Sequence, residues 1–302
     1  MGSGPAEATP LPLRTRLTGA GHFAAKSSLH IDHIEGFVVK NSELLKTVLE
    51  MFSHLVRRHP ALASELETLA AFSQGKGYGA ATTEQEVNVI SSLIKVHPAL
   101  AVDVGGNVGN YTSELYKRFP EIEIHTFEPA AVNLEHLLQK FAGIANIHIA
   151  PFALSDMAGS AVLYSNEHGS ALGSLTKRRL DHFNIPFDKE EVVRSVRFEE
   201  YWHETLGKRP VDIVKLDVEG HELSVLNGFG DALKYCKGIQ FEFGGCNIDT
   251  RTFFQDFWYF FQSAGYDIFR ITPYGAERIG RYKEADEFFS TTNYVAINKY
   301  PG

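Results

Sequence analysis

The stretch AVDVGGNVGNYT, residues 101–112, carries the strongest functional signal in the chain. A short apolar run surrounds Asp103, and three glycines and two asparagines follow before Thr112. Glycine lacks a Cβ, so such a backbone permits both tight turns and the close approach of a ligand. The stretch therefore predicts either a plain turn or a ligand-binding loop at the end of a strand.

The glycine spacing separates the ligands that such a loop binds. A dinucleotide fingerprint, G-x-G-x-x-G, requires its second glycine at position 107 or 108, which Asn107 and Val108 occupy. A P-loop requires a closing Gly-Lys-Ser/Thr, which is absent. A nicotinamide dinucleotide and a nucleoside phosphate are therefore disfavoured, whereas S-adenosylmethionine and a simple turn remain.

From residue 99 onward, short apolar runs alternate with helical patterns. Strands are expected at ALAVDVG, EIHTFEP, NIHIAPFAL, DIVKLDVEG, GIQFEF, YDIFRI and NYVAINK. This alternation predicts an α/β fold with a doubly wound, mostly parallel sheet. No helix separates the last two runs, so we expect them to form a C-terminal antiparallel hairpin.

The chain divides into three predicted parts. Pro, Gly, Ala and Thr dominate residues 1–28, which we expect to be a flexible arm. Residues 29–79 show helical spacing and predict an N-terminal helical extension, and residues 80–302 carry the alternating pattern. Within them, residues 155–210 interrupt the alternation. A connection this long is usually functional, and we expect a lid that meets the acceptor over the strand ends.

Composition limits the class of protein. The 302 residues are 44% hydrophobic, but no apolar run is long enough to span a bilayer. A net charge of −8 argues against nucleic acid as the main partner. The two cysteines, Cys236 and Cys246, exclude a disulfide framework, and the first residues lack the apolar core of a signal peptide. We therefore expect a cytoplasmic protein, whose oligomeric state the sequence leaves open.

An acidic residue stands where a ribose-binding group is expected. Glu128 ends the second predicted strand, one strand after the glycine stretch. A carboxylate at this place can accept hydrogen bonds from both ribose hydroxyls of a nucleoside. The alternative is a solvated strand end, which the combination with the glycine loop makes the weaker interpretation.

Four stretches together resemble a known family. VDVGGNVGNYT, FEP, FALSD and VDIVKLDVEGHELSVLNG are similar to motifs of the FkbM family of S-adenosylmethionine-dependent methyltransferases. The resemblance covers about residues 80–299, and its most specific part is the run Lys-Leu-Asp-Val-Glu-Gly-His-Glu at 215–222. Gly106 departs from the alanine that is commoner in the family. The resemblance implies a class I (Rossmann-like) methyltransferase fold and methyl transfer to a hydroxyl oxygen of a sugar, a glycan or a secondary metabolite.

The resemblance also implies how the cofactor is bound. The glycine loop would lie under the methionine part, Glu128 would bind the ribose, and the end of the third strand would meet the adenine. Asp103 could equally tie down the loop, Asp156 could form an Asx-turn instead, and Asn110 and Thr112 are expected to cap the next helix. The residues implied in cofactor binding are Asp103, Gly105, Gly106, Asn107, Gly109, Glu128, Ala153, Leu154 and Asp156.

A carboxylate–imidazole group is expected near the transferred methyl group. An unactivated hydroxyl is a poor nucleophile, so the site needs a base, a metal or close positioning. Asp217, Glu219 and His221 follow the fourth strand, and Glu242 lies on the next one. Asp217 or His221 is the expected base. As an alternative, Asp217, Glu219 and His221 could hold Mg²⁺ or Mn²⁺, whereas Glu222 is expected to cap a helix.

Two further patterns have plain structural interpretations. The aromatic segment with Phe253, Phe254, Phe257, Trp258 and Phe261 fits the core face of a helix, and the basic run 177–179 fits a solvated surface. Besides a methyltransferase, the sequence allows a catalytically silent S-adenosylmethionine-binding module. A nicotinamide oxidoreductase is less favoured because of the glycine spacing.

Overall fold

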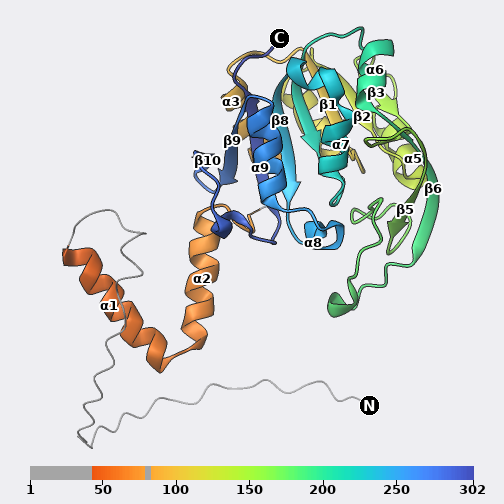
Figure 1. The fold of residues 1–302 in the computed structure, drawn as a ribbon. Helices are drawn as coiled ribbons and strands as arrows, with labels where there is room; N and C mark the ends of the chain where they lie inside the picture. The colour runs from red at the N-terminus through yellow and green to blue at the C-terminus, as the bar shows by residue number, and fades with distance from the viewer. Residues whose placement is uncertain (1–42, 79–82) are drawn as a thin grey trace, which may run out of the picture. The chain divides into compact units, whose positions relative to one another are not determined.

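The computed structural model describes residues 43–78 and 83–302, which form parts of two compact units, Met1–Pro60 and Ala61–Gly302 (Figure 1). The first unit contains the helix α1 (Glu43–Arg58). The predicted arm 1–28 lies outside the described residues, as does the beginning of the predicted extension. The predicted domain boundaries therefore stay predictions.

The second unit is built on an eight-stranded sheet with the order β10-β9-β11-β8-β7-β1-β2-β3. The five neighbouring strands β8, β7, β1, β2 and β3 are parallel. Strands β11, β9 and β10 continue the sheet in antiparallel fashion. This arrangement confirms the predicted fold class. The strands are β1 (Leu100–Val104), β2 (Glu123–Phe127), β3 (Ile147–Ala150), β7 (Val211–Leu216), β8 (Cys236–Phe243), β9 (Tyr266–Thr272), β10 (Gly275–Ile279) and β11 (Thr292–Asn298).

The C-terminal hairpin contains one strand more than the sequence predicts. Strands β9 and β11 pair antiparallel as expected, with Phe269 opposite Val295. The connection between them forms β10, which pairs with the outer edge of β9. Its residues GAERI are mostly exposed, so they lack the apolar run that identifies a buried strand.

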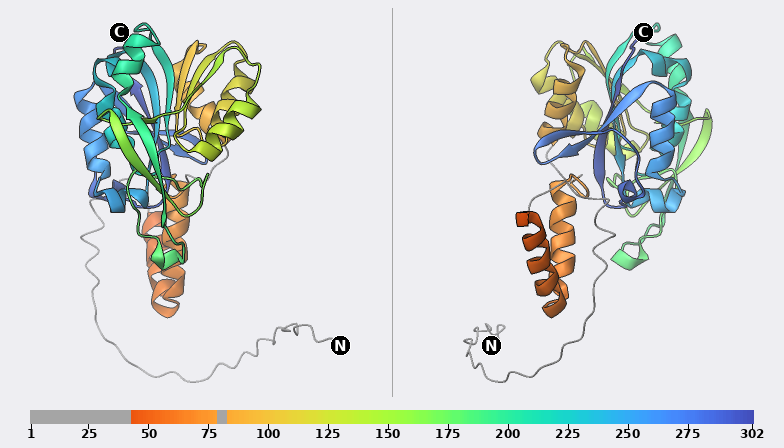
Figure 2. Two further views of the ribbon diagram at one scale, coloured as in Figure 1. Left: turned by 90° about the vertical axis from the view of Figure 1, so that its right-hand side faces the viewer. Right: turned by 60° about the vertical axis from the view of Figure 1, so that its left-hand side comes forward.

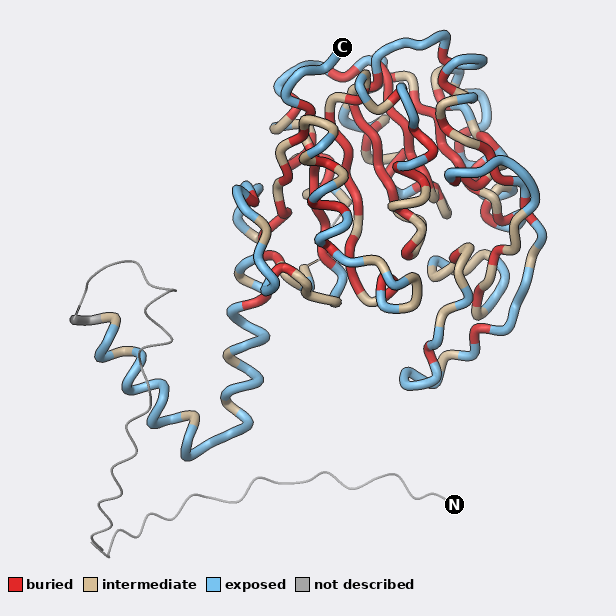
Figure 3. The backbone as a smooth tube through the Cα atoms, in the orientation of Figure 1, coloured by how far each residue is buried: buried red, intermediate tan, exposed pale blue. Residues whose placement is uncertain are grey.

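Helices cover both faces of the sheet, and each face has its own core. Figure 1 shows α7 and α9 on one side, and the buried strands between the helical layers are evident in Figure 3. One core joins the sheet to α6, α7 and α9, and the other joins it to α3, α4 and α5. The helices of this unit are α2 (Ala61–Ser73), α3 (Thr83–Ile94), α4 (Asn110–Arg118), α5 (Ala131–Lys140), α6 (Phe198–Glu204), α7 (Glu222–Gly228), α8 (Cys246–Thr250), α9 (Phe254–Ser263) and the short 3-10 turns Asp181–Phe183, Gly230–Tyr235 and Glu284–Asp286.

The aromatic segment is a core helix, as the sequence predicts, with one exception. Phe254, Phe257, Trp258 and Phe261 are buried in α9, whereas Phe253 precedes the helix and is 49% exposed. In the part of the chain that the structure describes, no helix is long and apolar enough to cross a membrane.

The interruption at residues 155–210 holds a second, three-stranded sheet with the order β4-β6-β5 (Figure 2). Its strands are β4 (Ala153–Leu154), β5 (Gly159–Ser165) and β6 (Lys189–Val196). β5 and β6 run antiparallel, and β4 follows directly from the central sheet's β3. The small sheet is thus joined to the carboxyl ends of the central strands, where open α/β sheets bind ligands.

Candidate functional site

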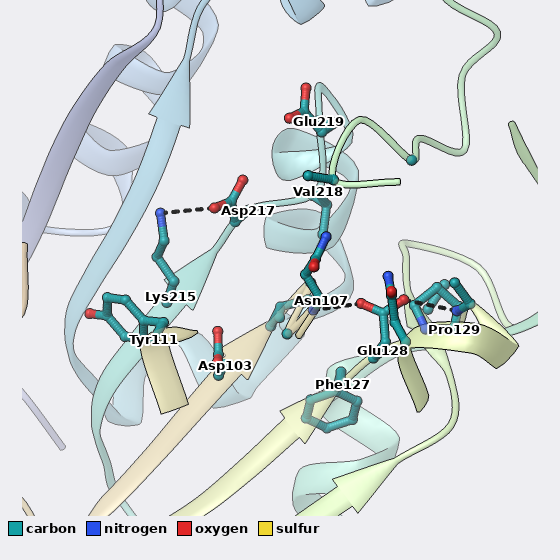
Figure 4. A pocket seen from close by; sticks show the side chains of 18 of the residues that line it. Asp103, Asn107, Tyr111, Phe127, Glu128, Pro129, Lys215, Asp217, Val218 and Glu219 are labelled. Atoms are coloured by element: carbon teal, nitrogen blue, oxygen red, sulfur yellow. Dashed lines mark hydrogen bonds and ion pairs between the residues drawn. The ribbon is translucent and has the colours of Figure 1, made fainter. Parts of the chain in front are cut away.

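A cavity of about 330 Å³ lies at the carboxyl ends of β1, β2, β7 and β8 (Figure 4). Strand order reverses between β1 and β7, which places the loop after β1 between the ends of β2 and β7. Of the predicted site residues, the cavity is lined by Asp103, Gly105, Gly106, Asn107, Glu128, Ala153, Leu154, Asp217, Glu219, His221 and Glu242.

Two predicted cofactor residues do not line the cavity. Gly109 has a φ of 75°, and a Cβ there would lie within 3 Å of the Leu137 and Phe141 side chains. Its conformation and packing place it at the start of α4. Asp156 is exposed and accepts a hydrogen bond from Ser155 Oγ at 3.0 Å.

The glycines of the loop are required by close packing. A Cβ on Gly105, whose φ is 84°, would lie 1.9 Å from the carbonyl oxygen of Asp217. The chain has glycine at 106, where alanine is commoner in the family it resembles. A Cβ on Gly106 would lie 2.2 Å from Cγ2 of the buried Thr126, so alanine would displace that side chain.

Glu128 holds the glycine loop and the start of the next helix together. Its Oε2 accepts from the backbone N–H of Asn107 at 2.7 Å, and its Oε1 accepts from that of Ala130 at 2.8 Å. Asn133 also donates to this carboxylate. Burial raises the pKa of Glu128, although these donors oppose the shift. A carboxylate has about four acceptor positions, so capacity remains for a ligand hydroxyl.

Asp103 is a buried anchor of the loop. Its Oδ2 accepts from Thr112 Oγ1 at 2.6 Å, and Thr112 also lies 2.7 Å from Thr126 Oγ1. Burial raises the pKa of Asp103 to about 6. The expected helix cap at Thr112 is wrong, because this residue lies inside α4 and its hydroxyl binds Asp103. At the position before α4, Gly109 has no side chain to form a cap.

Three carboxylates lie at the other end of the cavity. Asp217 is 41% exposed, while Glu219 and Glu242 are more enclosed. Burial, and then the nearby charge of Asp217, raise the pKa of Glu219 to about 7 and raise that of Glu242 well above its usual range. Such shifts keep protons available near the place where a hydroxyl would react.

The basic run 177–179 is only partly a solvated surface. Lys177 and Arg179 are exposed, but the Arg178 side chain is only 10% exposed. Its guanidinium donates to Glu219 Oε2 at 2.5 Å, and its Nε lies 3.8 Å from Asp249 Oδ2. The interpretation of the run as surface is wrong for Arg178, because a buried carboxylate partner compensates its charge.

His221 lies away from the other members of the predicted catalytic group. Its Nε2 lies 3.0 Å from Ser155 Oγ, next to the segment expected to meet the adenine. Burial lowers the pKa of His221, so its neutral form is favoured. Glu222 was expected to cap α7, but it is the first residue of that helix, and its Oε1 accepts from the N–H groups of Val218 and Gly220 in the preceding turn.

Asp217, Glu219 and His221, the alternative metal ligands, do not form a group with closely spaced ligand atoms in the part of the chain that the structure describes. Among residues 43–78 and 83–302, the one group of three His, Cys, Asp or Glu residues with ligand atoms within 4.8 Å of one another is Glu123, His125 and His148. The Arg209 guanidinium occupies its carboxylate, with nitrogen–oxygen distances of 2.6 and 2.8 Å. We interpret this group as an ion-pair cluster on β2 and β3.

Sequence reasoning missed several groups in the cavity wall. Glu86 of α3, Tyr111 of α4, Asn133 of α5 and Lys215 of β7 all line it. Lys215 stands two residues before Asp217. This spacing could have revealed Lys215 as a site residue, because alternate residues of a strand share a face. Glu86 precedes β1 in the chain, and no local pattern connects it with the site.

With this geometry established, comparison with known proteins assigns the family. Residues 103–268 match the Methyltransferase FkbM domain. The chain belongs to this family. This is the family whose motifs the sequence resembles.

Two named relatives are similar to part of the chain. "Methyltransferase 1" of Beauveria bassiana is 26% identical over 146 residues, which are 43% of this chain and 58% of the relative. "2-O-methyltransferase NoeI" of Sinorhizobium fredii is 24% identical over 191 residues, covering 60% of this chain and 78% of the relative. The chain thus spans little more than half the length of the fungal relative.

Solved methyltransferase structures are similar to the chain only at low sequence identity and low TM-score. Aeropyrum pernix fibrillarin in complex with S-adenosyl-L-methionine has a TM-score of 0.40 at 12% identity, covering 72% of this chain and 76% of that one. Precorrin-6y C5,15-methyltransferase from Geobacter metallireducens has a TM-score of 0.37 at 13% identity, with 71% and 89% covered.

Proposed function

We propose that the protein transfers the methyl group of S-adenosylmethionine to a hydroxyl oxygen of a neutral sugar, glycan or secondary metabolite. The observation that carries the proposal is that the two ends of one cavity carry different chemical groups. Glu128 and Asn133, which can accept hydrogen bonds from hydroxyl groups, lie at one end, and the carboxylates around Asp217 lie at the other.

The wall fits the cofactor at the end near Glu128. Among the described residues, Asn133 Oδ1 is buried without a hydrogen-bond partner, beside the Glu128 carboxylate. A buried acceptor of this kind normally has a donor, which a ribose hydroxyl would supply. We assign the ribose to Glu128 and Asn133, the methionine part to the loop Gly105–Asn107, and the adenine to Ala153, Leu154 and His221. When bound, the cofactor supplies a methyl group already activated by its sulfonium.

Asp217 is the better base of the two predicted candidates. Its carboxylate is open to the cavity, whereas His221 is engaged with Ser155 at 3.0 Å. As the acceptor oxygen bonds to the methyl carbon, the methyl–sulfur bond breaks and its electron pair goes to sulfur. The hydroxyl proton passes to Asp217. Glu242, with its raised pKa, is suited to donate a hydrogen bond to a neighbouring hydroxyl, whereas Glu219 is paired with Arg178.

The charge of the acceptor end favours a neutral substrate. Lys215 is the one Lys or Arg among the described residues that line the cavity, and carboxylates of Glu86 and Asp217 flank it. A phosphate, sulfate or uronate group would therefore meet carboxylates without an unpaired cation. A sugar hydroxyl suits this end better than a nucleic acid does, and the name of the Sinorhizobium relative, a 2-O-methyltransferase, agrees with oxygen as the acceptor atom.

The proposal is tested with S-adenosylmethionine labelled in its methyl group and a panel of matched acceptors. The panel pairs neutral glycans and phenolic or polyol metabolites with their uronate, sulfate and phosphate derivatives, and it includes RNA. We expect label in an O-methyl ether of a neutral acceptor. Label only in RNA, only in anionic acceptors, or at nitrogen or carbon would contradict the proposal, and failure of every acceptor would favour the silent binding module.

Metal dependence and location complete the proposal. We assign the reaction to Asp217 without a required divalent cation, so EDTA should leave the rate unchanged. A loss that Mg²⁺ or Mn²⁺ restores would reinstate the metal alternative. The two cysteines are buried and unpaired, which suits a reducing compartment such as the cytoplasm.

A further inference from the structure

Lys215 is a buried cation inside the wall of the proposed acceptor site. Its side chain is 4% exposed, and its Nζ lies 3.4 Å from Asp217 Oδ2 and 3.5 Å from Glu86 Oε2. Figure 4 shows Lys215 reaching from β7 toward Asp217. Asp217 faces the cavity on one side and the ammonium group on the other.

The Glu86 carboxylate is itself fixed by a chain of hydrogen bonds. Gln240 Nε2 donates to Glu86 Oε2 at 2.5 Å, and Gln240 Oε1 accepts from Tyr111 OH at 3.0 Å. The Lys215 ammonium lies 5.8 Å from the centre of the Tyr111 ring. All four of these side chains are buried, so the network has little freedom to rearrange.

The network joins two helices, α3 and α4, to two strands, β7 and β8. Glu86 comes from α3, upstream of the segment that matches the family, while Gln240 and Lys215 come from β8 and β7. A buried ammonium requires compensating charge, and each of its two carboxylates is stabilised by it in return. Burial opposes the charge of Lys215, but Asp217, Glu86 and Glu242 outweigh it and raise its pKa.

We propose that Lys215 is a positioning residue for methyl transfer: its ammonium group holds the Asp217 carboxylate directed into the cavity, and Glu86 holds Lys215 in place. This inference rests on the proposed function, in which Asp217 accepts the hydroxyl proton. It makes α3 part of the active site. Lys215 and Glu86 themselves act through Asp217 and need not touch the acceptor.

A purely structural role is the alternative, and kinetics separate the two. Lys215→Met removes the charge at similar length, and Glu86→Gln is the milder change if the first variant folds poorly. With the acceptor identified for the wild type, we expect kcat to fall about 10- to 1000-fold for Lys215→Met and less for Glu86→Gln, within the range for base catalysis. The KM for S-adenosylmethionine should stay within about threefold. The acidic limb of the kcat–pH profile should move to higher pH.

Lys237→Met is the matched control. This lysine also lies on a central strand and pairs with an aspartate, Asp212, at 3.2 Å, but it does not line the cavity. It should leave kcat and its pH profile unchanged. A lower melting temperature in Lys215→Met with wild-type kcat and pH profile would overturn the positioning role.

An infrared measurement tests the inference without an acceptor. The difference spectrum between a protein and its Asp217→Asn derivative isolates the Asp217 carboxyl band. At pH 7 we expect the carboxylate stretching band of Asp217 to shift and broaden in Lys215→Met, because the ammonium group no longer holds the carboxylate in one position. An unchanged band in Lys215→Met would refute the inference, whatever the acceptor panel shows. The expected change of the band, together with no methylated acceptor, would refute the proposed function alone.

Discussion

At the scale of single residues, the protonation of a buried carboxyl group can be linked to the stability of the fold. Glu222 is the clearest case, because its Oε1 accepts two backbone hydrogen bonds while its Oε2 is buried without a partner among the described residues. Burial raises the pKa of Glu222 to about 7. The raised value means that the folded state binds more protons than the unfolded state between about pH 4.5 and 7.

This linkage predicts how stability depends on pH. Glu222 should destabilise the fold progressively as pH rises through that window, and Glu222→Gln should remove its contribution. We expect the unfolding free energy of the variant, relative to the wild type, to increase by about 1–3 kcal/mol between pH 5 and pH 8. Chemical denaturation at the two pH values measures this. The exposed control Glu135→Gln should show no such change, and a parallel pH dependence of variant and wild type would contradict the linkage.

Residue-level prediction from the sequence succeeded where a motif is local. The glycine loop and Glu128 lie on consecutive strands of a parallel sheet, so the topology alone brings them to one edge. His221 was assigned to the methyl end only because it follows Asp217 in the chain. The turn at Glu219, whose φ is 52°, and the start of α7 direct it toward Ser155 instead, and no sequence pattern reveals that.

At the scale of elements, the segment between β5 and β6 is fastened to the end of β7. Arg178 donates to Glu219 Oε2 at 2.5 Å, and Ser174 Oγ donates to the Glu219 carbonyl oxygen at 2.8 Å. Residues 170–175 supply part of the cavity wall. The length of this interruption predicts a functional segment, but no local pattern predicts that one arginine of a basic run pairs with Glu219 in the cavity wall.

Removing this fastening should loosen the cavity wall. Arg178→Met should increase amide hydrogen exchange across residues 170–180, and it should raise the KM for the acceptor more than that for S-adenosylmethionine. The adjacent Lys177→Met is the control, since Lys177 is 57% exposed and its ion pair is with the exposed residue Glu190. Unchanged exchange in Arg178→Met would show that the ion pair does not hold the segment.

Over the whole molecule, the cavity belongs to one of the two units. Every residue that lines it lies between Thr83 and Glu242. Residues 75–78 also belong to that unit, because the N–H of Gly77 donates to Thr292 Oγ1 at 3.0 Å. The alternating pattern predicted this α/β body correctly, whereas the mostly exposed β10 was missed because edge strands lack a buried run.

Deletion of residues 1–60 should therefore leave a folded protein with unchanged cofactor affinity. We expect the dissociation constant for S-adenosylhomocysteine to stay within about threefold of the full chain, and the melting temperature of the remaining unit to stay near its original value. Calorimetry on both proteins checks this. A folded truncation that no longer binds S-adenosylhomocysteine would show that the first unit contributes to the site.

The central claim is that the cavity binds S-adenosylmethionine with its ribose on Glu128. Isothermal titration of the wild type, Glu128→Ala and the exposed control Glu135→Ala with S-adenosylhomocysteine and with NAD⁺ tests it directly. We predict that the wild type and the control bind S-adenosylhomocysteine equally, that Glu128→Ala loses about 1.5–3 kcal/mol of binding free energy, and that none binds NAD⁺. Undiminished affinity in a folded Glu128→Ala protein, or binding of NAD⁺ in place of S-adenosylhomocysteine, would contradict the claim.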